Sequence, residues 1–201
     1  MSGPPLRRAD LDPDPLRQFA AWYSQAADAV DAPEAVVLAT ATSSGAPSAR
    51  MVLLKGFDQR GFVFYTNYFS RKGQEIAQNP RAAMLFHWSP LGRQVRVEGA
   101  VHRIDAAESD AYFKTRPPGS RLSAAASPQS RPVASREVLE TAVAELESRY
   151  PDGAVPRPEE WGGLRLVPAR FEFWQHGEDR LHDRFTYRRD GRAWAVERLG
   201  P

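Results

Sequence analysis

The feature that most constrains the fold is a dense series of short β-type segments separated by turns. Segments rich in β-branched and aromatic residues occupy 34–42, 48–57, 62–67, 82–88, 94–104, 164–175, 181–187 and 193–199. Short strands joined by tight turns are typical of an antiparallel meander. Strands do not alternate regularly with helices and no G-x-G-x-x-G motif occurs, which argues against a Rossmann sheet.

Helical patterns interrupt this series at 15–30, 70–78, 105–116 and 137–150. Clustered strands with inserted helices predict a mainly β fold, a closed or nearly closed antiparallel barrel with flanking helices. The length of 201 residues fits a single domain over 1–201. Residues 1–15, rich in proline and charge, are expected to form a loose arm.

Composition excludes several functional classes. The 27 Lys and Arg residues nearly balance 25 Asp and Glu, so no nucleic-acid binder is expected and any anion site must be local. The chain has no cysteine, and its four histidines lack metal-ligand spacing, so no metal is predicted. The longest apolar run, Ala35–Ala41, is too short to span a membrane, and we expect a soluble cytoplasmic protein.

Two segments in the first half of the chain place cations where anions would bind. In RMVLLK, strand alternation predicts Arg50 and Lys55 on opposite faces of an apolar strand, where each needs an anionic partner. In YTNYFSRKGQEI, Arg71 and Lys72 fall in the first turn of a predicted helix, whose free N–H groups favour a phosphate. Ordinary charges at a strand rim, and a solvated Arg-Lys pair, are the alternatives.

A third group combines hydroxyls with a guanidinium. Tyr112 and Arg116 are predicted four residues apart on one helix face, and Ser120 follows after a Pro-Pro-Gly break. Two hydroxyls and an arginine are good phosphate ligands. The alternative is an amphipathic helix whose tyrosine packs and whose arginine is solvated.

The fourth group is RLHDR, at 180–184. Alternation predicts Arg180, His182 and Arg184 on one face of a strand, where neighbouring cations repel one another. That arrangement favours an anionic or electron-rich ligand against this face. A solvated strand face balanced by Glu178 and Asp183 is the alternative.

Taken together, these blocks resemble a known family. In order along the chain, the blocks are RMVLLK, GFVFYTNYFSRK, LFHW, RQVRVEG, SPQS, WGG, EFWQ and RLHDR. They closely resemble the pyridoxine/pyridoxamine 5′-phosphate oxidases over about Leu6 to Pro201. The resemblance implies an FMN-binding split β-barrel and a homodimer with FMN at the subunit interface.

The resemblance also implies roles for individual residues. The expected FMN contacts are Arg50, Met51, Val52, Leu53, Leu54, Lys55, Tyr65, Thr66, Arg71, Lys72, Gln94, Gln129, Ser130, Trp174 and Arg184. The expected ligands of the substrate phosphate are Lys55, Tyr112, Arg116 and Ser120. Arg180 and His182 would lie over the substrate's pyridine ring as the catalytic pair.

The implied activity is FMN-dependent oxidation of pyridoxamine or pyridoxine 5′-phosphate to pyridoxal 5′-phosphate, with dioxygen reduced to hydrogen peroxide. The alternatives are a related flavoenzyme acting on another small aromatic substrate, such as a phenazine-type oxidase, and a non-catalytic FMN or pyridoxal phosphate binder. Two features depart from the family pattern. The amino-terminal arm is shorter than in many members, and Ala124–Ala126 stands where some members carry a tryptophan.

Overall fold

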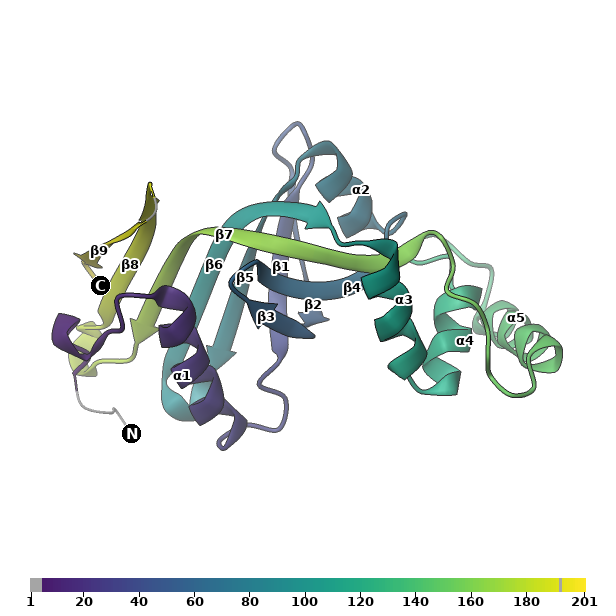
Figure 1. The fold of residues 1–201 in the computed structure, drawn as a ribbon, viewed down its shortest axis with the longest axis horizontal. Coiled ribbons are helices and arrows are strands. Elements are labelled where there is room, and N and C mark those ends of the chain that lie inside the picture. Colours follow the sequence, from purple (N-terminus) through teal and green to yellow (C-terminus); the bar gives the residue numbers. More distant parts are fainter. Residues whose placement is uncertain (1–4, 192) are drawn as a thin grey trace.

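The computed structural model describes residues 5–191 and 193–201, and its architecture is a curled antiparallel sheet of nine strands (Figure 1). Along the main path the strands lie in the order β2-β1-β5-β6-β7-β4-β3, while β8 pairs with β7 and β9 with β8. The strands are β1 (Ala35–Ala41), β2 (Pro47–Leu53), β3 (Gly56–Asp58), β4 (Gly61–Asn67), β5 (Arg81–Trp88), β6 (Arg93–Arg103), β7 (Trp161–Gln175), β8 (Asp183–Asp190) and β9 (Ala193–Leu199).

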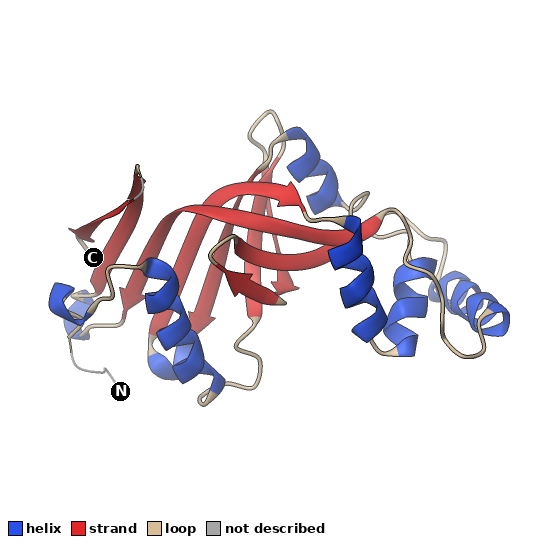
Figure 2. Cartoon of the chain, in the orientation of Figure 1, coloured by secondary structure: helices blue, strands red, loops and turns tan. Residues whose placement is uncertain are grey.

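Helices cover one face and one end of this sheet (Figure 2). They are α1 (Pro15–Ala27), α2 (Arg71–Gln78), α3 (Ala106–Thr115), α4 (Pro118–Ala126) and α5 (Arg136–Arg149). Figure 1 shows α1 against the sheet and α3, α4 and α5 gathered at the end opposite β8 and β9. The predicted mainly β fold with flanking helices is confirmed.

The main core forms where α1 packs on the sheet. Asp14 begins the helix by accepting a hydrogen bond from the Leu16 backbone, and Pro15 occupies its first turn. Phe19 is fully buried and meets Phe62 edge-on, with ring centroids 4.9 Å apart. Aromatic pairs of this geometry add to the stabilisation from apolar burial.

Strand β7 is the longest element and joins the two ends of the molecule. Its first part pairs with β4 and its last part with β8, while β6 runs alongside it. A bulge interrupts the β6–β7 register between Glu98 and Gly99. A Cβ at Gly99 would lie 1.9 Å from the Val167 carbonyl oxygen, so only glycine permits this close approach.

Several predicted element boundaries needed correction. The predicted bounds of β9, 193–199, agree with the structure. The segment 48–57, predicted as one strand, instead forms parts of two strands, β2 and β3. The Leu54 N–H bonds to the Glu34 carbonyl and the next N–H, of Lys55, bonds to the Val63 carbonyl. The chain therefore changes partner from β1 to β4 between β2 and β3. Helix α4 was not predicted, because the Pro-Pro-Gly sequence was interpreted only as a helix end; Pro118 instead begins a new helix.

The expected loose arm is ordered from residue 5 onward, and residues 1–4 lie outside the described part of the chain. The Leu6 N–H donates to Asp183 Oδ2 at 2.8 Å, and the Leu6 carbonyl accepts from Arg198 at 2.9 Å. The Leu6 side chain is buried. These contacts fasten the start of the described chain to β8 and β9.

Candidate functional site

A buried carboxylate organises the cations at the start of α2. Glu75 Oε2 accepts hydrogen bonds from the hydroxyls of Thr40 and Ser48, both at 2.5 Å. Glu75 also pairs with Arg50 at 3.3 Å and with Arg71 at 2.9 Å. Burial by itself would raise the pKa of Glu75, but the hydrogen bonds and the arginines lower it to about 2. Glu75 is therefore a fixed negative charge that orients two cations.

Lys72 lies beside this cluster in a polar cage. Its Nζ donates to Gln129 Oε1 at 2.9 Å, Thr66 Oγ1 at 3.1 Å and Ser70 Oγ at 3.3 Å, with no carboxylate among these partners. Burial, with a contribution from the Arg50 charge, lowers the pKa of Lys72 to about 8. Ser70 caps α2 by accepting from the Gly73 N–H, so the helix begins one residue later than the predicted 70–78. The cluster has three cations and one carboxylate, a charge balance that suits a phosphate at the helix start.

A second hollow lies next to this cluster, between β4, β7 and the helices α3 and α4. Tyr65 and Tyr112 stack with ring centroids 3.8 Å apart, and Trp161 stacks on Tyr65 at 5.3 Å. Burial, followed by nearby charges, raises the pKa of Tyr65 to about 12, so it stays a neutral phenol. The hollow of about 370 Å³ is lined by Asn67, Arg116, Gly119, Ser120, Ser123, Ala124, Ser127, Gln129 and Trp161.

Arg116 reaches this hollow, although not from the predicted helical position. It follows the last residue of α3 and has an extended backbone, so it is not on a helix face four residues after Tyr112. Its guanidinium lies over Trp161, 4.8 Å from the ring centroid. Within the described part of the chain, the buried Arg116 NH1 has no hydrogen-bond partner, and burial lowers the pKa of Arg116. Ser120 lines the same hollow from the first turn of α4.

A third group of residues lies at the other end of the molecule, where β6, β7 and β8 adjoin. Glu172 is buried and accepts from Arg96 NH2 at 2.5 Å and from Arg184 Nε at 2.9 Å. Arg184 NH1 also donates to the Gly200 carbonyl at 2.8 Å. Arg184 pairs in register with Trp174, and Trp174 with Gln94 across β6, so these three side chains share one face of the sheet.

The prediction that Arg180, His182 and Arg184 alternate on one strand face is wrong. Strand β8 begins only at Asp183, and Arg180 lies in a 3-10 turn over Glu178–Arg180. Asp179 and Arg180 have φ of 49° and 64°, in the left-handed region. His182 follows this turn with its ring centroid 4.6 Å from that of Trp174. A turn, rather than a strand, therefore carries the predicted catalytic pair.

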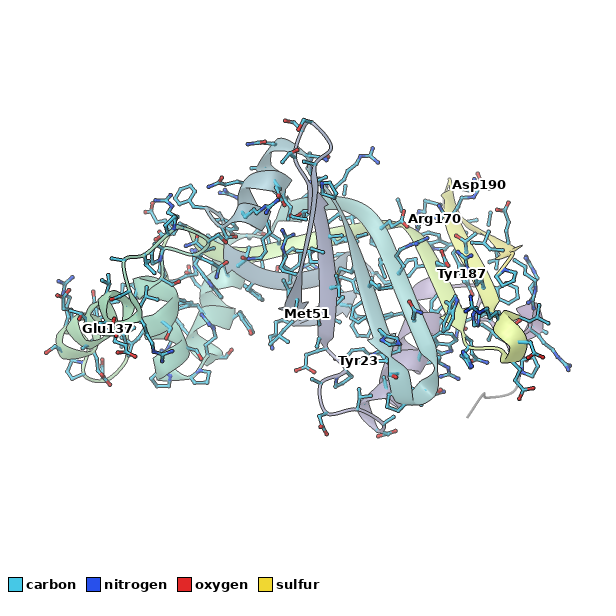
Figure 3. All side chains as sticks on the ribbon, turned by 180° about the vertical axis from the view of Figure 1, so that it is seen from behind. Tyr23, Met51, Glu137, Arg170, Tyr187 and Asp190 are labelled. Carbon is cyan, nitrogen blue, oxygen red and sulfur yellow. The ribbon has the colours of Figure 1, made fainter. Side chains whose placement is uncertain are left out.

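The remaining predicted contacts are distributed along β2 and around α4. Val52 and Leu54 point inward, whereas Met51 and Leu53 are exposed, with Met51 visible on β2 in the view from behind (Figure 3). Lys55 is exposed and lies between strands, so the predicted alternation with Arg50 does not apply to it. Ser130 is exposed, has φ of 67° and follows Gln129, which contacts Lys72.

The predicted site residues thus form two separate sets within one chain. The first set, around Lys72 and Arg116, lies near the start of β7. The second, around Trp174 and Arg184, lies at its end. The step from residue 161 to residue 174, at about 3.3 Å per residue, corresponds to roughly 40 Å of strand. Figures 1 and 2 show the α3–α5 end and the β8–β9 end on opposite sides of the molecule.

Sequence reasoning missed three residues that organise these sets. Glu75 was detectable as the acid four residues after Arg71 on a predicted helix. Trp161 could be assigned only from its stacking with Tyr65. Glu172 gives only a weak signal, a lone acid in the apolar stretch FEFW, where burial requires a cationic partner.

A separate cavity of about 810 Å³ lies where α1 meets β9, and its lining contains none of the predicted site residues. Within residues 5–191 and 193–201, no group of His, Cys, Asp or Glu side chains could hold a metal ion. Over the same residues, no helix is both long and apolar enough to cross a bilayer.

Family models match most of the sequence. The model described as pyridoxamine 5′-phosphate oxidase matches residues 24–150, and the one described as the pyridoxine 5′-phosphate oxidase C-terminal dimerisation region matches residues 161–201. A pyridoxine/pyridoxamine 5′-phosphate oxidase of Rubrobacter xylanophilus is 60% identical over 98% of this chain and 91% of its own length. A protein of the same name from Cyanothece sp. is 53% identical over 98% of this chain and 92% of its own.

Solved structures agree with the fold. PhzG from Burkholderia lata, in complex with tetrahydrophenazine-1-carboxylic acid, matches with a TM-score of 0.93 and 35% identity over the whole of both chains. A pyridoxamine 5′-phosphate oxidase-related, FMN-binding protein from Nostoc punctiforme has a TM-score of 0.74 and 19% identity, covering 95% of this chain and all of its own. The expected split-barrel fold is confirmed by the first of these matches.

Proposed function

Because the chain belongs to the pyridoxamine 5′-phosphate oxidase family, an oxidoreductase family, we propose that it oxidises pyridoxamine and pyridoxine 5′-phosphate to pyridoxal 5′-phosphate with FMN as cofactor. The choice of a phosphorylated substrate rests on the environment of Arg116. Its buried NH1 has no hydrogen-bond partner among the described residues and lies in a hollow with Ser120, close to the aromatic stack. A guanidinium nitrogen buried without a partner favours an anion, and a substrate phosphate supplies one.

The first set of residues fits the phosphate of FMN. Arg50 and Arg71 share the Glu75 carboxylate and Lys72 lies beside them without one, so the cluster keeps an excess of positive charge. The start of α2 adds backbone N–H groups on the same side. Burial is the main cause of the lowered pKa of Lys72, and repulsion by the Arg50 charge adds to it. A phosphate dianion would relieve this repulsion.

The two sets of residues would have different roles in the reaction. When bound, FMN supplies the redox chemistry, taking a hydride equivalent from the substrate C4′ and passing two electrons to dioxygen to give hydrogen peroxide. Arg116, Tyr112 and Ser120 would fix the substrate phosphate and thereby the position of its ring. Arg180 and His182 would contact that ring from the opposite side. Binding and orientation of the two ring systems are then the main contribution of the protein.

The separation of the two sets supports a homodimer. A flavin is far shorter than the roughly 40 Å of β7 between them, so one chain cannot present both sets to one molecule of FMN. A two-fold dimer brings the start of one chain's β7 to the end of its partner's β7 and so assembles two sites. The match of residues 161–201 to a dimerisation region supports the same assembly.

A phenazine-type oxidase is the second candidate. It is favoured by the similarity to PhzG, which was solved with a tricyclic carboxylic acid. A carboxylate could also pair with Arg116, but the additional hydroxyl of Ser120 in the same hollow is better used by the oxygens of a phosphate. Identities of 60% and 53% to named pyridoxine/pyridoxamine 5′-phosphate oxidases exceed the 35% to PhzG.

A peroxide assay with purified, FMN-loaded protein tests this proposal. Pyridoxamine 5′-phosphate should be oxidised, whereas unphosphorylated pyridoxamine and tetrahydrophenazine-1-carboxylic acid should react poorly. Arg116→Ala should raise KM for the phosphorylated substrate about 10- to 150-fold, because a hydrogen bond to a charged group contributes about 1.5–3 kcal/mol. Lys114→Ala, an exposed cation on α3, is the matched control. Faster turnover of the phenazine compound would favour the second candidate.

FMN affinity should depend on pH through Lys72. Its pKa of about 8 in the free protein should rise when a phosphate dianion binds, so that binding above pH 8 requires uptake of a proton. The dissociation constant for FMN should therefore be nearly constant below pH 7.5 and rise towards about tenfold per pH unit above pH 8. Quenching of flavin fluorescence between pH 6.5 and 9.5 measures it. Lys72→Met should bind FMN more weakly with no such rise, and a flat wild-type profile would contradict the assignment.

A further inference from the structure

The turn before β8 is closed by the side chain that it presents. The Gly177 N–H donates to Nδ1 of His182, with a nitrogen-to-nitrogen distance of 3.2 Å. Within the turn, the Leu181 N–H bonds to the Glu178 carbonyl and the His182 N–H to the Arg180 carbonyl. The His182 ring is half-buried, between the rings of Trp174 and His176. Its orientation is therefore determined from both sides.

The hydrogen bond to Nδ1 determines where the ring proton resides. A neutral imidazole has one nitrogen that donates and one that accepts. Since Nδ1 accepts from a backbone N–H, the proton must be on Nε2. Across the described residues, no atom of the chain accepts a hydrogen bond from His182 Nε2. Nε2–H is thus left free to donate to a bound molecule.

We propose that the Gly177 backbone N–H holds His182 in the Nε2–H tautomer, so that His182 serves as a hydrogen-bond donor to an acceptor atom of the substrate ring and not as a base. This inference rests on the proposed function only in naming the substrate ring as the group that accepts the hydrogen bond from Nε2. His182 becomes a specificity-determining residue, because the site then selects ring substituents that accept a hydrogen bond. Gly177 becomes its positioning residue.

Two features of the turn support a dedicated arrangement. A Cβ on Gly177 would lie 1.9 Å from the Leu181 carbonyl oxygen, so no other residue fits there without moving the turn. Asp179 and Arg180 both adopt left-handed backbone conformations, which non-glycine residues adopt only when the surroundings impose them. The bond from Gly177 to His182 closes the loop that contains these two residues. The same bond therefore also positions Arg180.

The ring proton can be located directly. In FMN-loaded protein labelled with ¹⁵N-histidine, two-bond ¹⁵N–¹H correlation spectra distinguish protonated from unprotonated ring nitrogens without any substrate. Four histidines must be assigned, and the signals absent from His182→Asn identify His182. We expect Nε2 protonated and Nδ1 unprotonated at pH 8. A proton on Nδ1 would overturn the inference, whatever the enzyme's activity.

Two variants separate the roles of the two ring nitrogens. In His182→Asn the amide oxygen can replace Nδ1 as acceptor, whereas the donor at Nε2 is lost. His182→Gln can restore a donor near the position of Nε2 but cannot close the turn. We expect the Gly177 amide to exchange slowly with deuterium in wild type and His182→Asn, and quickly in His182→Gln. Fast exchange in both variants, or slow exchange in both, would contradict the proposed contact.

Kinetics then test the donor role. His182→Asn should raise KM by about 2- to 10-fold, as expected for loss of one neutral hydrogen bond, with a smaller change in kcat. A general base would instead give a large loss of kcat with little change in KM, and that result would refute the donor role. If the tautomer is as expected but pyridoxamine 5′-phosphate is not oxidised, the proposed function fails while the contact between Gly177 and His182 stands.

Discussion

Glu172→Ala should lower the free energy of unfolding by about 3–5 kcal/mol and release FMN, because it leaves two half-buried arginines without their counter-charge. The carboxylate is 7% exposed and accepts from Arg96 at 2.5 Å and Arg184 at 2.8 Å. With the carboxylate removed, the two guanidiniums would repel each other across β7. Arg184, which we expect at the flavin, would lose its orientation.

A nearby pair provides the control for this substitution. Arg96 also contacts Glu98 at 2.7 Å, but the Glu98 side chain is 38% exposed, against 7% for Glu172. Glu98→Ala should therefore cost at most about 1 kcal/mol and leave FMN bound. Urea unfolding at one fixed protein concentration gives the stabilities, and flavin fluorescence gives the occupancy. Equal and small effects of the two substitutions would show that Glu172 does not organise this end of the site.

Met51→Glu should convert the dimer into an inactive monomer without unfolding the chain. Met51 is 59% exposed on β2 and faces away from α1 (Figure 3). Met51 pairs in register with Val37 on β1, and Val37 pairs with Leu85 on β5. These three apolar side chains therefore form a continuous row on the same face of the sheet. A carboxylate at this position would have to be buried unpaired on dimerisation. The dimer dissociation constant should rise by about 100-fold or more.

Sedimentation velocity and bound flavin measure this effect together. Val167→Glu is the matched control, since Val167 is also exposed and apolar but lies beside Leu16, on the α1 side of the sheet. The control should remain a yellow, active dimer. A Met51→Glu protein that stays dimeric with full flavin content would place the interface elsewhere on the molecule.

Local sequence signals predicted the elements whose determinants are themselves local. The start of α2 near Ser70 and the cations of its first turn lie within a few residues of one another, and the β-type segment 193–199 coincides with β9. The same reasoning failed at Leu54 and Lys55. There the chain changes from one neighbouring strand to another, and no local pattern encodes the partner of a backbone N–H.

Sequence patterns selected candidate site residues by type but did not predict their geometry. Arg180 and His182 were selected by their chemistry, yet alternation assigned them to a strand that begins only at Asp183. The left-handed conformations of Asp179 and Arg180 depend on Gly177 and on the His182 ring, which are contacts across the turn. Likewise, the partners of Arg184 on β7 and near the end of β9 follow only from the folded sheet.

The length of β7 has a genetic consequence. Suppose that each site uses the start of one chain's β7 and the end of the other's. In a mixed dimer, one chain can carry a defect near Trp161 and the other a defect near Trp174. Both defects then fall in the same one of the two sites. The other site then receives two unaltered strand ends. Two alleles that are each inactive when expressed alone would complement one another in the same cell, provided that their lesions lie at opposite ends of this strand.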